Sequence, residues 1–179
     1  MKQIVILLFI LTATFSFGQI YPVQNDSFKT KIEQAVNAKN VLIKKEFTGL
    51  NRIKKVDFKF LKVYNFETQV TTKGLYISPK SRRYKKTHYL DSSEIVRMFN
   101  YLLFMDTMKF NYFSYSEFKY NICSIDNFNV TMNYAVIDWV WKYSIFINKK
   151  KIKRKGRKLN KNEFKQLIEI FGKAKTLLQ

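Results

Sequence analysis

The chain opens its folded part with a helical pattern of apolar residues. Within 25–40, Phe28, Ile32, Ala35 and Val36 fall at i, i+4, i+7 and i+8 and form one apolar stripe. This spacing predicts a short helix over 25–40.

Three strand-like segments follow this helix. The first is 41–47, the second begins at Val56, and the third is 68–77. In the second segment apolar residues alternate with polar ones up to Phe60 and then shift by one position at Leu61. The shift predicts a β-bulge near Phe60–Leu61.

Two further helices are predicted from their start signals. Asp91-Ser-Ser-Glu94 has the spacing of a capping box, in which the aspartate accepts from first-turn amides and the glutamate reaches back. Asn160 and Glu163 mark the start of a last helix, whose apolar stripe is wide enough to cover a sheet.

The clearest β pattern lies between these two helices. Apolar residues alternate with polar ones through 118–122, 128–136 and 139–147, with a turn at 124–127. This predicts a meander with one buried face. The element order α-β-β-β-α-β-β-β-α indicates an α+β fold, with an antiparallel β-sheet of about five to six strands and helices packed on one face.

The N-terminal residues have the layout of a secretory signal peptide. A positive n-region precedes the unbroken apolar run 4–11, and Ser16 and Gly18 occupy the −3 and −1 positions of a cleavage site. The run is shorter than the ~20 apolar residues of a spanning helix. We expect residues 1–18 to be a cleaved signal peptide and 19–179 to be a single periplasmic or extracellular α+β domain with no transmembrane segment.

The chain is strongly basic, with 33 Lys and Arg against 13 Asp and Glu, a net charge of +20. Removing residues 1–18 takes away one lysine and no acid, which leaves +19.

The chain has one cysteine, Cys123, which excludes an intramolecular disulfide and is expected to be a buried small hydrophobe. The one histidine, His88, is expected to pack or hydrogen-bond. One His and one Cys argue against a zinc site. No catalytic residue, metal ligand or cofactor is predicted.

Basic residues collect in two segments, which supply the candidate anion-binding residues. Eight of the ten residues of 149–158 are basic, and 80–86 is a second basic loop. Clustered cations attract phosphates and other polyanions, and such binding weakens with salt. A solvated connection is the alternative explanation, and the sequence does not say whether the two segments share a face. The candidates are Lys149, Lys150, Lys151, Lys153, Arg154, Lys155, Arg157 and Lys158, with Lys80, Arg82, Arg83, Lys85 and Lys86.

Aromatic and acidic residues leave two further interpretations open. Aromatics alternating with lysines are typical of surfaces that stack single-stranded nucleic acid, but strict alternation over 128–147 favours a core role. These aromatics are Phe58, Phe60, Phe118, Tyr120, Trp139 and Trp141. Carboxylates are scattered singly, and their spacing neither proves nor excludes a catalytic pair. They include Asp57, Glu67, Asp91, Glu117, Asp126 and Asp138.

Several short motifs occur in a recognisable order. KGLYIS at 73–78 is followed by KTHYLD at 86–91, by YSEFKY at 115–120 and by the final helix, after a leader that ends in Gly18-Gln19. This order resembles a group of uncharacterised small exported proteins of Bacteroidota. The resemblance implies an exported α+β domain and carries over no activity.

The sequence favours a non-enzymatic exported protein that binds through a basic surface. The expected partners are an anionic lipid, an acidic glycan or an acidic protein of the envelope. An extracellular nucleic-acid-binding protein is the first alternative. A hydrolase with a dispersed carboxylate site is the second.

Overall fold

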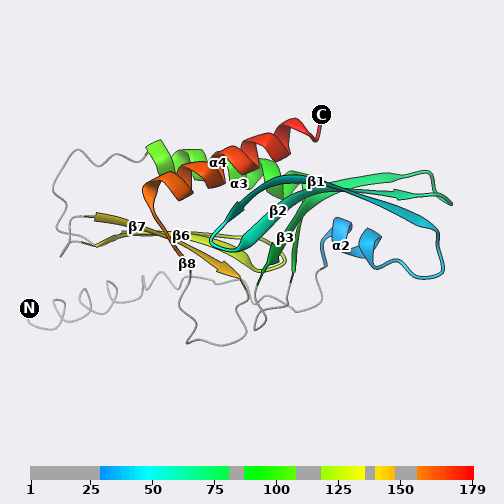
Figure 1. Cartoon of the computed structure of the whole chain (residues 1–179), viewed down its shortest axis with the longest axis horizontal. Helices are drawn as coiled ribbons and strands as arrows, with labels where there is room; N and C mark the ends of the chain where they lie inside the picture. Colours follow the sequence, from blue (N-terminus) through cyan, green and yellow to red (C-terminus); the bar gives the residue numbers. More distant parts are fainter. Residues whose placement is uncertain (1–28, 81–86, 108–117, 136–139, 148–156) are drawn as a thin grey trace, which may run out of the picture.

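The computed structural model describes residues 29–80, 87–107, 118–135, 140–147 and 157–179 (Figure 1). Within these ranges the strands form two antiparallel sheets of four strands each, accompanied by three helices. The predicted α+β class is confirmed. The predicted single sheet of five to six strands is wrong, because the chain divides its strands between two sheets.

The first sheet has the order β1-β2-β3-β4, and each strand is antiparallel to the next. Its strands are β1 Ile43–Ile53, β2 Val56–Asn65, β3 Thr71–Pro79 and β4 His88–Asp91. β4 is missing from the sequence prediction because it is short and leads directly into a helix.

The second sheet has the order β5-β6-β7-β8, again antiparallel throughout. Its strands are β5 Phe118–Cys123, β6 Phe128–Ala135, β7 Val140–Ile147 and β8 Arg157–Leu159. The predicted meander is confirmed in β5, β6 and β7. β8 was not predicted because its basic residues show no alternation.

The described helices are α2 Lys31–Val36, α3 Ser92–Thr107 and α4 Lys161–Thr176. α3 and α4 lie side by side on one side of the molecule (Figure 1). The predicted capping box of the last helix is confirmed. The Asn160 side chain accepts from the Glu163 N–H at 2.8 Å, and the Glu163 carboxylate accepts from the Asn160 N–H at 2.8 Å.

One hydrophobic core joins both sheets to α3 and α4. Phe58 and Leu75 enter it from the first sheet, Phe128 from the second, and Leu102 and Phe171 from the helices. All five side chains are at most 1% exposed. The two sheets therefore share one interior, which fixes their edges and turns relative to each other.

α2 lies on the opposite face of the first sheet from α3 and α4 (Figure 1). Its fully buried Ile32 packs on Leu61 and Val63 of β2, in a small cluster separate from the main core. The prediction that all helices pack on one face is therefore wrong.

The same arrangement explains the misplaced bulge. β2 pairs with β3 without any register shift from Val56 to Tyr64, so no bulge occurs at Phe60–Leu61. The apolar pattern shifts there because β2 is covered on both faces, by the main core at Phe60 and by α2 at Leu61. The register shift occurs instead in β1, between Gly49 and Asn51.

α2 is shorter than the predicted helix, and two side chains hold its start: the N-cap Thr30, which accepts from the Glu33 N–H at 3.2 Å, and the distant Asp91. The helix ends at Val36, and residues 25–28 lie outside the described part of the chain. The Asp91 carboxylate accepts from the backbone N–H groups of Lys31 and Ile32, each at 2.9 Å. Only half of the predicted Asp91–Glu94 capping box forms, since Glu94 accepts from the Asp91 N–H at 3.1 Å.

The polar residues of β6 are more buried than the predicted single buried face allows. Asn129 is 4% exposed and Thr131 is 3% exposed, although both alternate with core residues. β6 is an inner strand, so the side chains of β5 and β7 flank it on both sides.

None of the helices in the described ranges is long and apolar enough to cross a bilayer.

Candidate functional site

The structure describes only part of the predicted anion-binding surface. Lys80, Arg157 and Lys158 lie within the described ranges. The other predicted residues, in 82–86 and 149–155, lie outside them, as does the predicted signal peptide at 1–18. The site is therefore built from the described ends of the two basic segments and from the residues that they contact.

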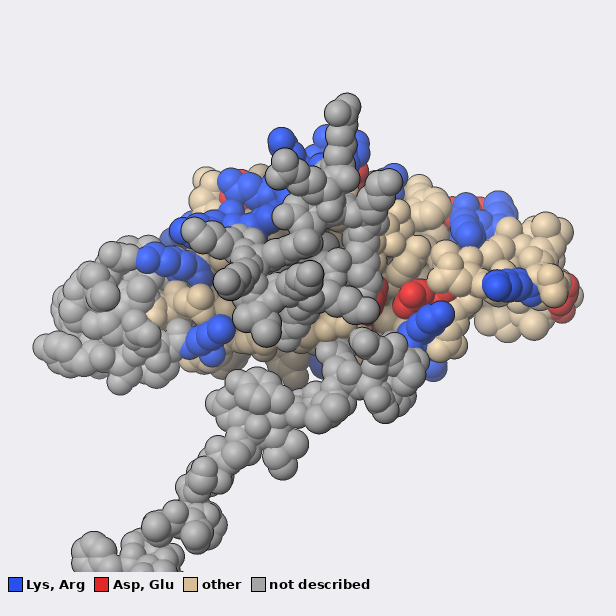
Figure 2. Space-filling view, turned by 90° about the horizontal axis from the view of Figure 1, so that it is seen from below, with Lys and Arg blue, Asp and Glu red and all other residues tan. Residues whose placement is uncertain are grey.

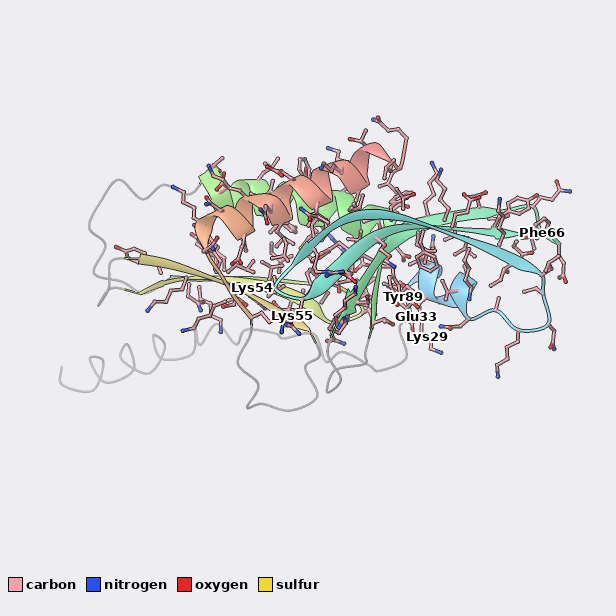
Figure 3. All side chains as sticks on the ribbon, viewed as in Figure 1. Lys29, Glu33, Lys54, Lys55, Phe66 and Tyr89 are labelled. Carbon is pink, nitrogen blue, oxygen red and sulfur yellow. The ribbon has the colours of Figure 1, made fainter. Side chains whose placement is uncertain are left out.

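Both described ends meet at the turn between β1 and β2. The backbone N–H of Lys80 donates to the carbonyl of Lys55 at 2.8 Å. The guanidinium of Arg157 donates to the carbonyl of Lys54. Lys80 and Arg157, which are far apart in sequence, therefore meet at one two-residue turn, Lys54-Lys55. Figure 3 labels the two lysines of this turn.

We call Arg52, Lys54, Lys55, Lys80 and Arg157 the basic turn cluster. Lys158 does not join it. Cross-strand pairing places Arg157 opposite Ile145 and Lys158 opposite Ser144, so the two side chains point to opposite faces of the second sheet.

Two carboxylates lie among the cations of the basic turn cluster. Asp57 accepts from Arg52 Nε at 2.5 Å, and its second oxygen lies 3.5 Å from Lys80 Nζ. Partial burial alone would raise the pKa of Asp57. The hydrogen bond from Arg52 and the charges of Arg52 and Lys80 outweigh this and hold the pKa below its ordinary value. Lys54 Nζ lies 2.9 Å from Glu163.

These acids position the cations without neutralising the cluster. Five basic side chains face two carboxylates, and the exposed Lys55 has no ion pair within the described part of the chain. The side chains of Arg52 and Lys80 stay 55% and 58% exposed, so solvent or a ligand can reach them.

A shallow depression adjoins the cluster on the first sheet. Its volume is about 470 Å³. It is lined by Gly49, Leu50, Asn51, Arg52, Asp57, Phe58, Lys59 and Lys80. Lys and Arg side chains are also spread over much of the described surface in Figure 2, with few acids between them. Three cations line the depression, and two of them, Arg52 and Lys80, belong to the basic turn cluster.

Aromatic residues that suggested a stacking platform are mostly structural where they are described. Phe58 and Phe60 are each 1% exposed in the main core, and Tyr120 packs partly buried against it. Of Phe118, Trp139 and Trp141 the structure describes no side chain. An aromatic that the sequence analysis did not single out, Phe47, is 49% exposed with Lys59 Nζ 5.8 Å from its ring centroid.

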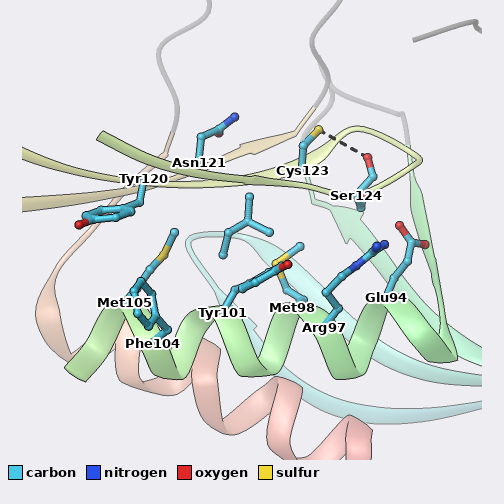
Figure 4. Close-up of a pocket in the computed structure, with 11 residues that line it drawn as sticks. Glu94, Arg97, Met98, Tyr101, Phe104, Met105, Tyr120, Asn121, Cys123 and Ser124 are labelled. Carbon is cyan, nitrogen blue, oxygen red and sulfur yellow. Dashed lines mark hydrogen bonds between the residues drawn. The ribbon is translucent and has the colours of Figure 1, made fainter. Parts of the chain in front are cut away.

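A second cavity, of about 470 Å³, opens between α3 and β5 (Figure 4). Met98, Tyr101 and Met105 line it from α3, and Tyr120 and Ile122 from β5. Its one lining carboxylate is the buried Glu94, which accepts from the N–H groups of Ile125 at 2.7 Å and Asp91 at 3.1 Å. Burial raises the pKa of Glu94. The described lining holds no second carboxylate, which the hydrolase alternative requires.

Cys123 and His88 differ in how they match their predicted roles. Cys123 is exposed, so the prediction that it is buried is wrong; its strand lies at the edge of the second sheet. His88 is fully buried, with Nδ1 2.6 Å from the Asp126 carbonyl. The predicted packing and hydrogen-bonding role of His88 is confirmed.

Sequence reasoning missed the two residues at the centre of the site, Lys54 and Lys55. The predicted strands gave no signal for them, because the first ended at 47 and the second began at Val56, which left a link of eight residues. The structure extends β1 to Ile53, and Lys-Lys is not one of the residue pairs that mark a two-residue hairpin turn. Their contacts with Lys80 and Arg157 had no sequence signal.

Comparison of the chain with family models, with curated protein sequences and with solved structures finds no match. The resemblance to exported Bacteroidota proteins stays a prediction.

Proposed function

We propose that this is an exported, non-enzymatic protein that binds an anionic component of the cell envelope at the basic turn cluster. The observation that carries the proposal is the convergence of Lys80 and Arg157, the described ends of the two basic segments, on the Lys54-Lys55 turn. A ligand held at this turn would meet five cationic side chains. Asp57 and Glu163 neutralise only part of their positive charge.

The backbone of the turn supports a role for the lysine side chains. Lys54 and Lys55 have φ of 48° and 63°, in the left-handed region. A side chain there costs about 1 to 2 kcal/mol per residue, and a turn of this kind favours Asn-Gly. Two lysines at these positions add charge at the expense of stability, which fits a binding role.

The chemistry favours phosphate, sulfate or carboxylate groups on an extended ligand. Arg52 offers a planar donor group for such oxyanions, while Lys55 and Lys80 supply point charges. The neighbouring depression of about 470 Å³ has room for one headgroup or sugar unit. Anionic lipids and acidic glycans are the envelope components that carry these groups.

A turn variant tests the proposal without weakening the fold. Lys54→Asn together with Lys55→Gly removes two charges and installs the preferred hairpin turn. We expect the melting temperature to be kept or raised. Because each lysine near an anionic surface contributes about 1 kcal/mol, the dissociation constant should rise roughly 30-fold.

The purified protein would be titrated against phosphatidylglycerol vesicles, heparin and oligo(dT) at low and moderate salt. Lys31→Gln with Lys165→Gln is the control, because it removes the same charge from two exposed lysines that have no ion pair in the described ranges. Equal weakening in the turn variant and the control would show that net charge alone drives binding, and the proposed site would be wrong.

The nucleic-acid alternative has one observation in its favour. The exposed Phe47 and the cation Lys59 lie together on β1 and β2, as base-stacking and phosphate-binding residues do. Clear preference for oligo(dT) over heparin and vesicles, lost in Phe47→Ala, would select this alternative.

Export is tested separately, by fractionating cells that make the full chain and sequencing the N-terminus of the product. We expect the protein outside the cytoplasm, with a chain that starts at Gln19. An intact N-terminus in the cytoplasm would contradict the proposal.

A further inference from the structure

The far end of the first sheet carries an exposed apolar tip, formed by Leu42, Phe66 and Val70. Their side chains are 66%, 47% and 54% exposed, and Leu42 and Val70 are the two most exposed large apolar residues described. Phe66 lies at the extreme end of the sheet, remote from the helices α3 and α4 (Figure 3). A soluble surface gains nothing from three such residues at one projecting end.

The loop that presents the tip has a defined shape. The Asn65 N–H donates to the Val70 carbonyl at 3.0 Å, and the Phe66 N–H donates to the Leu42 carbonyl at 3.1 Å. The Asn65 side chain accepts from the N–H groups of Glu67 and Thr68 at 2.9 and 3.2 Å. The rings of Tyr64 and Phe66 pack edge to face, 4.9 Å apart. The apolar side chains are thus held outward by the backbone.

Lysines surround the strands directly behind the tip. We call Lys44, Lys45, Lys62 and Lys73 the lysine collar. Two of these ammonium groups have partners: Lys44 pairs with Glu46 at 2.6 Å, and Lys73 donates to the backbone carbonyl of Leu178 at 2.8 Å. The exposed Glu67 of the loop is a second acid nearby. Three of the collar lysines line a hollow of about 410 Å³ on one face of the sheet, together with Glu46, Tyr64, Phe66 and Thr71.

We propose that the apolar tip inserts into the interface of an anionic lipid bilayer, with the lysine collar at the level of the phosphates. Lys44 follows Leu42 by two residues and Lys73 follows Val70 by three, a spacing of about 7 to 10 Å along a strand. Apolar groups of interfacial proteins penetrate to a depth of about 5 to 10 Å. Lys45 and Lys62 have no ion pair within the described ranges, and their stems can adjust to bring the ammonium groups to the phosphates. Lys44 and Lys73 would exchange Glu46 and the Leu178 carbonyl for phosphate oxygens.

Charge complementarity selects this occupant over a second copy of the chain. A second copy would cover the apolar tip but would bring four more lysines against two acids, so the positive charge of the collar would stay uncompensated. An anionic membrane satisfies the apolar tip and the lysines at once, because it offers an apolar layer beneath a negative surface. This inference goes beyond the anion site at the basic turn cluster, and either can fail alone.

The depth of the tip can be measured with a single label. Val70→Cys in a Cys123→Ser background would carry an environment-sensitive fluorophore on the full protein. We expect a blue shift with vesicles of phosphatidylcholine and phosphatidylglycerol, and none with phosphatidylcholine alone. The same label at Lys165→Cys, on the exposed face of α4, should stay unshifted with both.

A variant series separates insertion from simple charge attraction. Leu42→Ser, Phe66→Ser and Val70→Ser together should weaken binding to the anionic vesicles at least about tenfold, since three apolar side chains lose their burial. Leu103→Ser with Leu177→Ser, at exposed apolar positions on other elements, should leave binding unchanged. The circular dichroism spectra of all variants should match that of the unchanged chain, because every substituted residue is on the surface.

Three results would overturn the proposal. The first is equal vesicle binding by the triple variant and the unchanged chain. The second is an unshifted label at position 70 on vesicles that do bind the protein. The third is a concentration-dependent dimer, formed without lipid and abolished by the triple variant, which would assign the tip to a second copy. The Lys54→Asn/Lys55→Gly variant should keep the blue shift, so loss of the turn site and loss of the tip are told apart.

Discussion

Gly74 is the position where the close approach of β3, β4 and α2 depends on the absence of a side chain. It pairs with Leu61 of β2 and with Asp91 of β4. A Cβ atom at Gly74 would lie 2.6 Å from the backbone carbonyl oxygen of Leu90. It would also lie 2.9 and 3.0 Å from the Cγ1 and Cβ atoms of Ile32. We therefore expect Gly74→Ala to force the backbone of β4 and helix α2 away from β3.

The structure allows the size of the effect to be estimated. The carbonyl of Leu90 belongs to the sheet and cannot rotate away, while Ile32 is fully buried and holds α2 on the sheet. Overpacking of this kind costs about 1 to 3 kcal/mol. For a chain of this length the melting temperature should fall by about 3 to 10 °C.

Gly49→Ala is the matched control, because no atom beyond Gly49 and its two chain neighbours lies within 4 Å of a Cβ at this position. Removing a glycine there should leave stability unchanged or raise it by up to about 1 kcal/mol. Both variants would be compared by thermal and urea unfolding. Equal melting temperatures for Gly74→Ala and Gly49→Ala would refute the steric argument, because only one of the two positions is crowded.

The remaining predictions concern a buried acid and a helix cap. Because burial raises the pKa of Glu94, the folded state holds its proton more tightly than the unfolded state. The free energy of unfolding should therefore fall as pH rises from 4.5 through the raised pKa, and urea midpoints should show less of this slope in Glu94→Gln. Asn160→Ala removes the cap of α4 and should cost about 1 kcal/mol in urea unfolding. Asn162→Ala, at an exposed helical position next to it, should cost nothing, and an equal loss would contradict the capping role.

Local patterns predicted the elements that have a strong local cause. The alternation in β6 places Phe128, Val130 and Met132 in the core, as expected from a period of two. Asn160 and Glu163 form the predicted capping box because both partners lie within four residues of each other. Such features are predictable because the residues that form them are close neighbours in the sequence.

The features that were missed depend on partners far away in the chain. Asp91 has the correct spacing to cap α3, yet its carboxylate binds the start of α2, sixty residues earlier. β8 is three residues long and is held as a strand by β7. The division into two sheets likewise reflects pairing choices, which alternation within a strand does not specify.

The basic turn cluster likewise depends on contacts between residues that are far apart in the chain. Neither basic segment contains a signal for the turn at Lys54-Lys55, because the contacts of Lys80 and Arg157 are to backbone carbonyls. Any residue offers a carbonyl, so side-chain identity does not mark the partner. Composition predicted that basic residues matter, and only the tertiary structure indicates where their described ends meet.

The basic turn cluster and the apolar tip lie at opposite ends of the same pair of strands (Figure 3). β1 has eleven residues, which separates the two ends by about 33 Å at strand geometry. The Debye length at physiological salt is about 8 Å, so charges bound at one end are screened from the other. One headgroup cannot reach both ends, and a polyanion held at the turn does not compete with a membrane at the tip. If both proposals hold, the first sheet is a rigid spacer between a bilayer surface and a second anionic ligand. That arrangement gives a structural reason for a basic protein to keep its apolar residues at one end and its convergent cations at the other.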